Sequence, residues 1–464
     1  MKIVMKFGGS LLASEGGISQ VARVVAKYHR ENKVVCVVSA LGDITDILLE
    51  ASQSAKSWKE PQIDRFLRML RRVHADAMKR ARIRSQIQPA TSQINGLLQD
   101  LKVVLLGVSM LGELTPRSRD LIVSFGERLS AIVVSSALAD REIPTRAMTG
   151  GEAGIITDNT FGEAIPVLSR TRRQAGKTLS ELLSKGIVPV VTGFIAQSEG
   201  GEITTLGRGG SDYTATIIGD AAAADEVWIW TDVDGIMTAD PKLVQSARVI
   251  EELSYAEAEE MAFFGAKNMH PLALGPVRLR KIPVRIKNGF RPELHGTLIH
   301  AREWKSASIA KSVAVVDNVG LLTVSGETLA GRPGTAAKVF QILGENGINI
   351  FMISQSVSES NISMIVRRGQ LEKASQALSE GLVSHRIKAR IQVESDVAVL
   401  AVVGAGMKGT PGVAARVFTA VARTGVNVRM IAQGSSELNI SFVVKSKDSA
   451  KAVRALHGTL VLKK

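Results

Sequence analysis

The sequence predicts an α/β protein: a three-layer αβα sandwich with a mostly parallel central sheet, followed by two small βαββαβ modules. Over the first three hundred residues, apolar runs alternate with helical patterns, which is typical of helices packed on a parallel sheet. Most of these runs are apolar throughout instead of alternating, as strands covered on both faces are. A gapless internal repeat follows them and predicts the two modules.

The predicted elements alternate along the chain. Strands are expected at 2–7, 34–40, 143–149, 187–195, 226–231 and 282–288. Helices fit between them at 17–31, 57–84, 117–139, 169–185, 211–223 and 254–264. The turns that carry the candidate charged and polar residues all follow strands, and open α/β sheets bind their ligands at the carboxyl ends of strands.

Composition bounds the class of protein. Hydrophobic residues make up 45% and charged residues 22%, the ordinary globular range. We find no signal peptide and no uninterrupted apolar stretch near ~20 residues, so no membrane span is predicted. The single cysteine, Cys36, excludes an intrachain disulfide and favours a reducing cytoplasm. It lies in a buried-strand pattern, so we expect it to be an inert core residue.

The basic charge of the chain is unevenly distributed. The net charge is +14, and residues 56–84 carry ten Lys or Arg against three Asp or Glu, which is half of the excess. Apolar residues of this segment recur at helical spacing: Ile63, Phe66, Leu67, Leu70, Val73 and Ala77. We therefore predict an amphipathic helix with a solvated basic face. Nucleic-acid binding is the alternative, although aromatic residues that stack on bases are nearly absent there.

The repeat aligns residues 331–363 with residues 409–441 at an offset of 78. The two copies share these pairs: Pro333/Pro411, Gly334/Gly412, Phe340/Phe418, Asn349/Asn427, Gln355/Gln433 and Asn361/Asn439. Two copies are too few for a solenoid, so a paired regulatory domain is predicted. We expect a first domain at 1–300, a linker at 301–312, and modules at 313–392 and 393–464, with strand exchange between the modules possible.

Two glycine-rich turns are candidates for binding phosphate. In "TTLGRGGSDYTA" (204–215), Arg208 precedes Gly209 and Gly210, and Ser211 and Asp212 follow. This turn is either a tight turn that needs positive φ or a cradle of backbone N–H groups for an anion. In "MKFGGSLL" (5–12) a lysine precedes two glycines, the reverse of the Walker P-loop order. The alternative there is an ordinary turn at the end of a strand.

Other turns offer polar groups. Ser39 and Thr45, in "VVSALGDITD", are suited either to a polar substrate or to capping a helix. Glu127 lies on an apolar helix, where a carboxylate needs a partner: a ligand ammonium, or an arginine such as Arg128 or Arg119.

The last two motifs lie farther along the chain. "WTDVDGIMTADPK" (230–242) suggests a metal, a nucleotide sugar or an Asx turn. "FFGAKNMHP" (263–271) adds Lys267, and its His270 has no second metal-ligating residue nearby.

Together the motifs resemble the aspartate kinases of the amino acid kinase superfamily. KFGG, VSA…T, FGE, GRGGSD, TDV.G…DP and GAK…HP occur in this order and precede two repeats that resemble ACT domains. The resemblance covers essentially the whole chain, and "TLGRGGSDY" and "FGAKNMHP" are its most specific parts. It is to the monofunctional, archaeal-type enzymes, because no dehydrogenase domain follows.

The resemblance implies roles for individual residues. Lys6 would hold the transferring phosphate, and Asp212 would organise this lysine. The ATP site would comprise Lys6, Gly8, Gly9, Ser10, Thr231, Asp232, Met237, Lys242 and Lys267. The aspartate site would comprise Ser39, Thr45, Glu127, Arg208, Gly209, Gly210 and Ser211, with Glu127 facing the ammonium and Arg208 a carboxylate. The effector sites would comprise Asn349, Gln355, Asn427 and Gln433.

The implied reaction converts ATP and L-aspartate to 4-phospho-L-aspartate and ADP, the first step of lysine, threonine and methionine biosynthesis. Mg²⁺ would be held mainly by the phosphates, so no protein metal ligand is assigned. The resemblance also implies inhibition by lysine or threonine and a homodimer or homotetramer formed through the ACT domains. Neither a membrane nor a specific nucleic acid is an expected partner.

The chain departs from the family pattern at four positions. Leu11, Met237, Lys242 and Asp234 stand where the family usually has Ser, Tyr, Arg, and Pro or Ser. The resemblance places Met237 and Lys242 on the nucleotide side, so the departures at these two positions bear on ATP affinity more than on substrate identity. Two alternatives stay open: a related carboxylate kinase acting on N-acetylglutamate, and an amino-acid sensor whose kinase domain has decayed.

Overall fold

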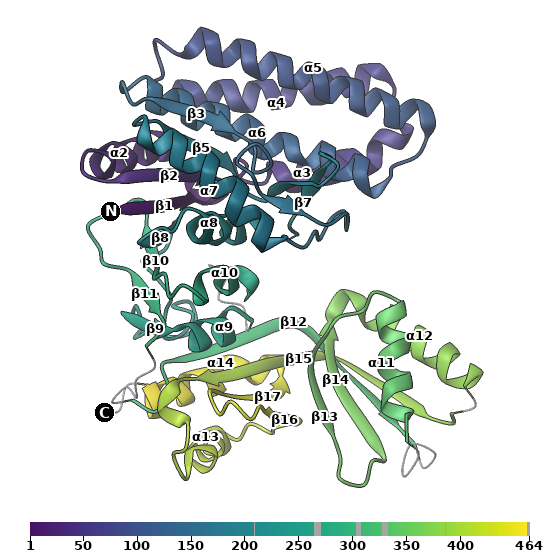
Figure 1. Cartoon of the computed structure of the whole chain (residues 1–464). Helices are drawn as coiled ribbons and strands as arrows, with labels where there is room; N and C mark the ends of the chain where they lie inside the picture. Colours follow the sequence, from purple (N-terminus) through teal and green to yellow (C-terminus); the bar gives the residue numbers. More distant parts are fainter. Residues whose placement is uncertain (208, 264–270, 303–307, 327–332, 386, 462–464) are drawn as a thin grey trace. The chain divides into compact units, whose positions relative to one another are not determined.

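The computed structural model describes residues 1–207, 209–263, 271–302, 308–326, 333–385 and 387–461 (Figure 1). The chain forms two compact units. Unit 1 contains Met1–Ile236, Val249–Tyr255 and Asn268–Arg302, and unit 2 contains Met237–Arg248, Ala256–Lys267 and Glu303–Lys464. Two segments between residues 237 and 267 therefore belong to the unit that also holds the C-terminal repeats.

Unit 1 is built on an eight-stranded sheet in the order β3-β5-β2-β1-β8-β10-β11-β9. Its strands are β1 Lys2–Phe7, β2 Lys33–Val38, β3 Thr145–Met148, β5 Val188–Thr192, β8 Glu226–Thr231, β9 Glu252–Ser254, β10 Val284–Asn288 and β11 Thr297–His300. Every neighbouring pair is parallel except β10–β11. The predicted mostly parallel sheet is confirmed, and Cys36 is buried in β2 as expected.

A second, three-stranded sheet was not predicted. It consists of β4 Ile156–Thr157, β6 Ile195–Ser198 and β7 Ile203–Thr205. The predicted strand at 187–195 is wrong at its end, because Phe194 adopts a left-handed φ of 65° and separates β5 from β6. A side chain at positive φ strains the backbone, so this break is imposed by the surrounding packing.

Helices cover both faces of the large sheet (Figure 1). The helices of unit 1 are α1 Gly9–Ala13, α2 Gly17–His29, α3 Ile44–Ser54, α4 Glu60–Arg80, α5 Ile87–Leu111, α6 Pro116–Ala139, α7 Leu168–Ser184, α8 Gly210–Ala221 and α10 Gly275–Arg278, with short turns of 3-10 helix at η1 Ala55–Ser57 and η2 Pro271–Leu274. Helix α9 Tyr255–Phe263 belongs to unit 2 from Ala256 onward. Side chains from β1, β2, α2, α4 and α6 form one apolar core. The three-layer αβα sandwich follows from this arrangement.

The basic segment 56–84 is an amphipathic helix over part of its length only. Helix α4 buries Ile63, Leu67 and Leu70 and ends at Arg80, before the predicted boundary. The unpredicted α5 packs on α4 and α6. Its proline, Pro89, is tolerated because the first N–H groups of a helix have no partner within the helix.

Two helices are as long and apolar as a membrane span, which the sequence did not lead us to expect. They are α5 and α6, whose most apolar 18-residue windows are 28% and 78% buried. A core helix of a folded domain has the same length and composition, so this is weak evidence for a membrane span.

Unit 2 contains a six-stranded antiparallel sheet in the order β13-β14-β12-β15-β17-β16. Its strands are β12 Ser312–Ser325, β13 Ile350–Gln355, β14 Asn361–Arg367, β15 Arg390–Val403, β16 Met430–Gln433 and β17 Asn439–Lys445. Its helices are α11 Thr335–Glu345, α12 Leu371–Ser384, α13 Val413–Ala422 and α14 Ser449–Leu456, with short helical turns at η3 Arg368–Gln370, η4 Ala405–Met407, η5 Ser446–Asp448 and η6 His457–Val461.

The two long strands of this sheet serve both repeats. The second half of β12, Val319–Ser325, pairs with β14, and the second half of β15, Val397–Val403, pairs with β17. Over their lengths β12 and β15 also pair with each other. Each repeat therefore has its own helices and apolar core but takes half of each long strand. The exact domain boundaries stay a prediction.

Candidate active site

Lys6 and Asp212 form the charged centre of the candidate site. Lys6 lies near the carboxyl end of β1, and its Nζ is 2.6 Å from Oδ1 of Asp212. Asp212 lies in the first turn of α8, where the helix dipole favours a carboxylate. Both side chains are about nine-tenths buried, with exposures of 12% and 10%. The structure thus joins two residues that are 206 positions apart in the sequence.

Close packing requires a glycine at Gly9, in the turn after β1. A Cβ on Gly9 would lie 2.7 Å from the carbonyl oxygen of Ala40, in the turn after β2. Gly9 also accepts a hydrogen bond from the backbone N–H of Gly42 at 3.1 Å, and the N–H of Gly8 donates to the carbonyl of Trp230 at 3.2 Å. The turns after β1, β2 and β8 are therefore held together, and Ser10 is exposed beside them.

Glu127 is a buried carboxylate without a cationic partner in the described chain. Helix α6 approaches the turn after β2 so closely that a Cβ on Gly126 would lie 3.0 Å from the Ala40 Cβ. Glu127 Oε1 accepts hydrogen bonds from Ala40 N and Thr45 Oγ1, both at 3.2 Å. Its Oε2 is buried and accepts no hydrogen bond from any described residue. Burial raises the pKa of Glu127 to about 7.

An arginine partner for Glu127 was one of two expectations, and the described contacts do not support it. The Arg128 guanidinium lies over the ring of Phe125 instead, 4.5 Å from its centroid. Thr45 contacts Glu127, while Ser39 is half-buried at the end of β2. The unpartnered Oε2 therefore keeps the ligand-ammonium interpretation open.

The glycine-rich turn before α8 does use positive φ. Gly207 and Gly209 have φ values of 75° and 70°, so the tight-turn interpretation is confirmed at these two positions. Gly209 is the N-cap of α8. A Cβ on Gly210 would lie 3.0 Å from the Phe194 ring, so the chain is tightly packed there. Arg208 lies outside the described residues, so no contact of its guanidinium is known.

Asp120 is a buried residue that the sequence motifs did not indicate. It is 1% exposed, and its Oδ2 accepts hydrogen bonds from the N–H groups of Gly162 at 2.8 Å and Thr205 at 2.9 Å. Burial raises the pKa of Asp120. Thr205 precedes the turn that carries Gly207 and Gly209, so Asp120 anchors the start of that turn to α6. The available signal was spacing: Asp120 and Glu127 are seven residues apart and share a helix face.

The expected nucleotide residues are distributed between the two units. Thr231 donates to its neighbour Asp232 at 3.0 Å after β8. Asp234 accepts hydrogen bonds from Asn288 at 2.7 Å and from Arg291, so it ties the turns after β8 and β10 together. Met237 and Lys242 belong to unit 2. Lys267 and His270 lie outside the described residues.

The four expected effector residues are exposed in unit 2. Gln355 ends β13 and Gln433 ends β16, the two edge strands of the six-stranded sheet. Asn349 and Asn427 lie shortly before the same strands. The repeat therefore places equivalent amides at the two edge strands of the sheet, and the effector role of these residues stays a prediction.

Comparison with known proteins identifies the family. The model described as "Amino acid kinase family" matches residues 1–288, and an ACT-domain model matches 322–382 and 400–460. Aspartokinase 1, chloroplastic, of Arabidopsis thaliana is 34% identical over 98% of this chain and 79% of its own length. The bifunctional aspartokinase/homoserine dehydrogenase 2, chloroplastic, of Zea mays is 34% identical over 99% of this chain and 51% of its own length. The chain therefore spans about half the length of the bifunctional relatives it matches.

Solved structures agree with this result. The E. coli aspartokinase III in complex with aspartate and ADP (R-state) has a TM-score of 0.84 and 29% identity, covering 99% of this chain and 100% of that chain. The lysine and aspartate complex of the same enzyme (T-state) has a TM-score of 0.81 and 30% identity, covering 99% of both chains. The chain belongs to the amino acid kinase family, and within it to the aspartokinases.

Proposed function

We propose that this protein transfers the γ-phosphoryl group of ATP to the side-chain carboxylate of L-aspartate, giving 4-phospho-L-aspartate and ADP. The proposal rests on two features near the carboxyl ends of the neighbouring strands β1 and β2, one suited to an anion and one suited to a cation. One is the Lys6–Asp212 ion pair, and the other is the buried, unpartnered Oε2 of Glu127. The first suits a transferring phosphate, and the second suits an ammonium group.

Glu127 is the residue proposed to select an amino acid. Its buried oxygen gains an ionic partner when a ligand ammonium arrives, which offsets the unfavourable burial of a carboxylate. Ser39 and Thr45 supply hydroxyls beside it, and Arg208 pairs with a substrate carboxylate in this proposal. Gly209, Gly210 and Ser211 then bring backbone N–H groups close to the bound aspartate.

Phosphoryl transfer needs no strong general base, because the substrate carboxylate is already a nucleophile. A carboxylate oxygen forms a bond to the γ-phosphorus, and the bond from that phosphorus to the β–γ bridging oxygen breaks. Lys6 stabilises the charge that develops on the phosphoryl oxygens, and Asp212 holds Lys6 in position. Mg²⁺ would be held mainly by the phosphates, whose charge it would partly neutralise, and we assign it no protein ligand. Catalysis rests mainly on positioning and fixed charges.

The nucleotide site is proposed to lie beside the turns after β1 and β8. Gly8, Gly9 and Ser10 would line the phosphates, and Thr231 and Asp232 would lie beside the nucleotide. The remaining members of the proposed site are Met237, Lys242 and Lys267. Asp234 is not assigned to the proposed site, and its carboxylate accepts hydrogen bonds from Asn288 and Arg291.

Regulation is proposed to act through unit 2. Ala239 and Val244, which flank Lys242, are buried in the apolar core of the second repeat. Thr238 contacts the buried His457 at 2.9 Å, and its carbonyl accepts from Val313 N. A change in the second repeat would therefore reach the segment that carries Lys242.

The proposed effector is lysine or threonine, bound near Asn349, Gln355, Asn427 and Gln433 in a homodimer or homotetramer. The kinase domain is placed at 1–300, the linker at 301–312 and the two ACT-like domains at 313–392 and 393–464. A cytoplasmic location completes the proposal, based on the single buried cysteine.

A comparison of acceptors tests the substrate. Purified protein is incubated with ATP, Mg²⁺ and hydroxylamine, together with L-aspartate, N-acetyl-L-glutamate or no acceptor. We expect ATP-dependent hydroxamate with aspartate alone, because N-acetylglutamate has no ammonium for Glu127. Hydroxamate with N-acetylglutamate would favour the related carboxylate kinase. The absence of hydroxamate with either acceptor, together with lysine or threonine binding, would favour an amino-acid sensor.

A further inference from the structure

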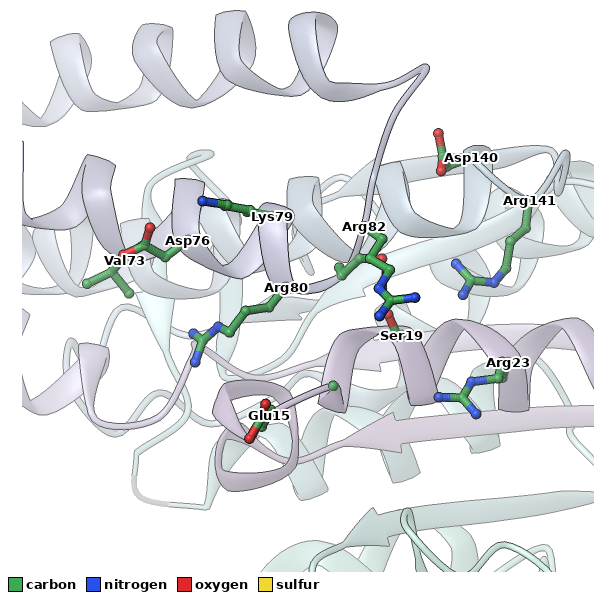
Figure 2. A pocket seen from close by; sticks show the side chains of 12 residues that line it. Glu15, Ser19, Arg23, Val73, Asp76, Lys79, Arg80, Arg82, Asp140 and Arg141 are labelled. Atoms are coloured by element: carbon green, nitrogen blue, oxygen red, sulfur yellow. Dashed lines mark hydrogen bonds between the residues drawn. The ribbon is translucent and has the colours of Figure 1, made fainter.

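A groove of about 1220 Å³ lies in unit 1 where α2 begins and where α4 and α6 end (Figure 2). It shares no lining residue with the proposed active site. We propose that this groove is a second anion-binding site, which takes a small molecule carrying two or more phosphate groups. The proposal goes beyond the proposed kinase reaction and does not depend on it.

Cations from three helices gather around this groove. They are Arg23 of α2, Lys79 and Arg80 of the last turn of α4, Arg82 after α4, and Arg141 after α6. Figure 2 shows Arg23, Arg82 and Arg141 with their guanidinium groups directed toward the same space. Guanidinium groups bind phosphate oxygens through paired N–H donors, and several together suit a multivalent anion.

Most of these cations have no counter-charge. The side chains of Arg23, Lys79, Arg80 and Arg82 form no hydrogen bond or ion pair with any described residue. Other cations of the same region are engaged: Arg72, for example, lies 3.9 Å from Asp76. The four unpaired groups therefore concentrate positive potential over one opening, which attracts anions.

The groove also holds three acids, Glu15, Asp76 and Asp140, against its five cations, so its lining keeps a net positive charge. Asp140 Oδ1 accepts hydrogen bonds from the N–H groups of Arg84 at 3.1 Å and Ser85 at 2.8 Å, and from the Ser85 hydroxyl at 2.8 Å. Asp76 faces Arg72. Glu15 lies on the far side of the opening from Arg141 in Figure 2. Asp140 also fixes the segment that presents Arg82.

The backbone at Arg82 supports a role for its side chain. Arg82 has a φ of 57°, a left-handed conformation. Its N–H donates to the Lys79 carbonyl at 3.0 Å, and the Ile83 N–H donates to the Met78 carbonyl at 3.2 Å, which together close α4 in a Schellman-type cap. This position favours glycine, because a Cβ there strains the backbone. Helix closure alone therefore does not call for an arginine here.

The lining favours a small phosphorylated molecule over a nucleic acid. None of its 12 residues is aromatic, so bases would find no stacking surface. Figure 2 shows the guanidinium groups of Arg23, Arg82 and Arg141 directed toward the same space, which suits a compact anion. Inorganic tripolyphosphate is a suitable probe for this chemistry.

The test is calorimetric titration of the full chain with tripolyphosphate at 150 mM NaCl. The Arg82→Gly variant removes the guanidinium at a position where glycine is favoured, so its melting temperature should not fall. We expect at least tenfold weaker tripolyphosphate binding at the groove in this variant and in Arg23→Ala. The matched control is Arg65→Ala, an exposed arginine of α4 outside the groove, which should bind as the wild type does.

The proposed active site also binds phosphates, so the Lys6→Ala variant is used to distinguish tripolyphosphate binding there from binding at the groove. In Lys6→Ala the groove event remains, and in Arg82→Gly it is lost while kinase activity is unchanged. Unaltered tripolyphosphate binding in both groove variants overturns the proposal, as does an equal loss in Arg65→Ala. A single-stranded oligonucleotide that binds more tightly than tripolyphosphate, and only when Arg82 is present, replaces the small molecule by nucleic acid. These outcomes hold whether or not the kinase proposal succeeds.

Discussion

Ionisation of Glu127 should control aspartate binding near neutral pH. Burial raises its pKa from 4.5 to about 7 in the unliganded protein. A carboxyl with this pKa is roughly one-tenth ionised at pH 6 and nine-tenths ionised at pH 8. Only the ionised form pairs with the substrate ammonium, so the Kd for aspartate should fall about tenfold between pH 6 and pH 8. Binding at pH 7 should release about half a proton.

The raised pKa of Glu127 also affects folding stability, which falls over the pH range in which aspartate binding strengthens. Because the folded-state pKa lies above the unfolded value of 4.5, this group's contribution is complete below pH 4.5 and is lost as the pH rises through about 7. The difference of about 2.5 between the two pKa values corresponds to about 3 kcal/mol. Glu127→Gln should therefore stabilise the unliganded protein at pH 8 by up to that amount while it weakens aspartate binding.

The assay is calorimetric titration with aspartate at pH 6, 7 and 8, in two buffers of different ionisation enthalpy to count protons. Glu127→Gln should abolish both the proton release and the pH dependence. Glu113→Gln, which changes an exposed acid, is the control. If wild-type binding is independent of pH and releases no proton at pH 7, Glu127 does not bind the ammonium. Full affinity in Glu127→Gln would lead to the same conclusion.

Three further predictions concern Lys6, Asp120 and Gln355. Lys6→Ala should lower kcat far more than it raises the KM for aspartate, because its partner charge develops during transfer; a near-normal kcat in steady-state assays removes Lys6 from the catalytic role. Asp120→Ala should lower the free energy of unfolding in urea by about 2–4 kcal/mol, because the N–H groups of Gly162 and Thr205 lose their acceptor, and it should raise the KM for aspartate. Asp120→Asn should retain most of the stability and of the affinity for aspartate, and equal effects of the two variants would contradict the anchoring role. Gln355→Ala should weaken inhibition by lysine or threonine about fivefold or more with basal activity kept, and unchanged inhibition curves would place the effector elsewhere.

The large sheet could be predicted because its strands carry their own signal. Strands buried on both faces are apolar throughout, so β1 and β8 were predicted with the residue ranges that the structure has. Helix α5 lacked such a signal, because its apolar residues spread around the helix and its first turn contains Pro89. The end of β5 was not predicted either, because a phenylalanine at left-handed φ has no sequence signature.

The candidate site was predictable residue by residue but not as a set of contacts. Local sequence offered Glu127 either an arginine or a ligand ammonium, and only the packing of α6 on Ala40 removed Arg128 from consideration. The Lys6–Asp212 pair depends on the order of strands in the sheet, which periodicity does not determine. Similarly, the repeat alignment allowed strand exchange between the modules, but it did not identify β12 as a strand that both repeats use.

The most direct test follows the oxygen of the substrate carboxylate. L-Aspartate labelled with ¹⁸O in its side-chain carboxylate is incubated with the protein, ATP and Mg²⁺, and the product is trapped with hydroxylamine. Hydroxylamine attacks the acyl carbon, so the phosphate that leaves keeps the bridging oxygen. The account predicts one ¹⁸O atom in each phosphate released with the hydroxamate, by mass spectrometry. Unlabelled phosphate, formed together with ADP at the same rate with or without aspartate, would contradict transfer to the carboxylate.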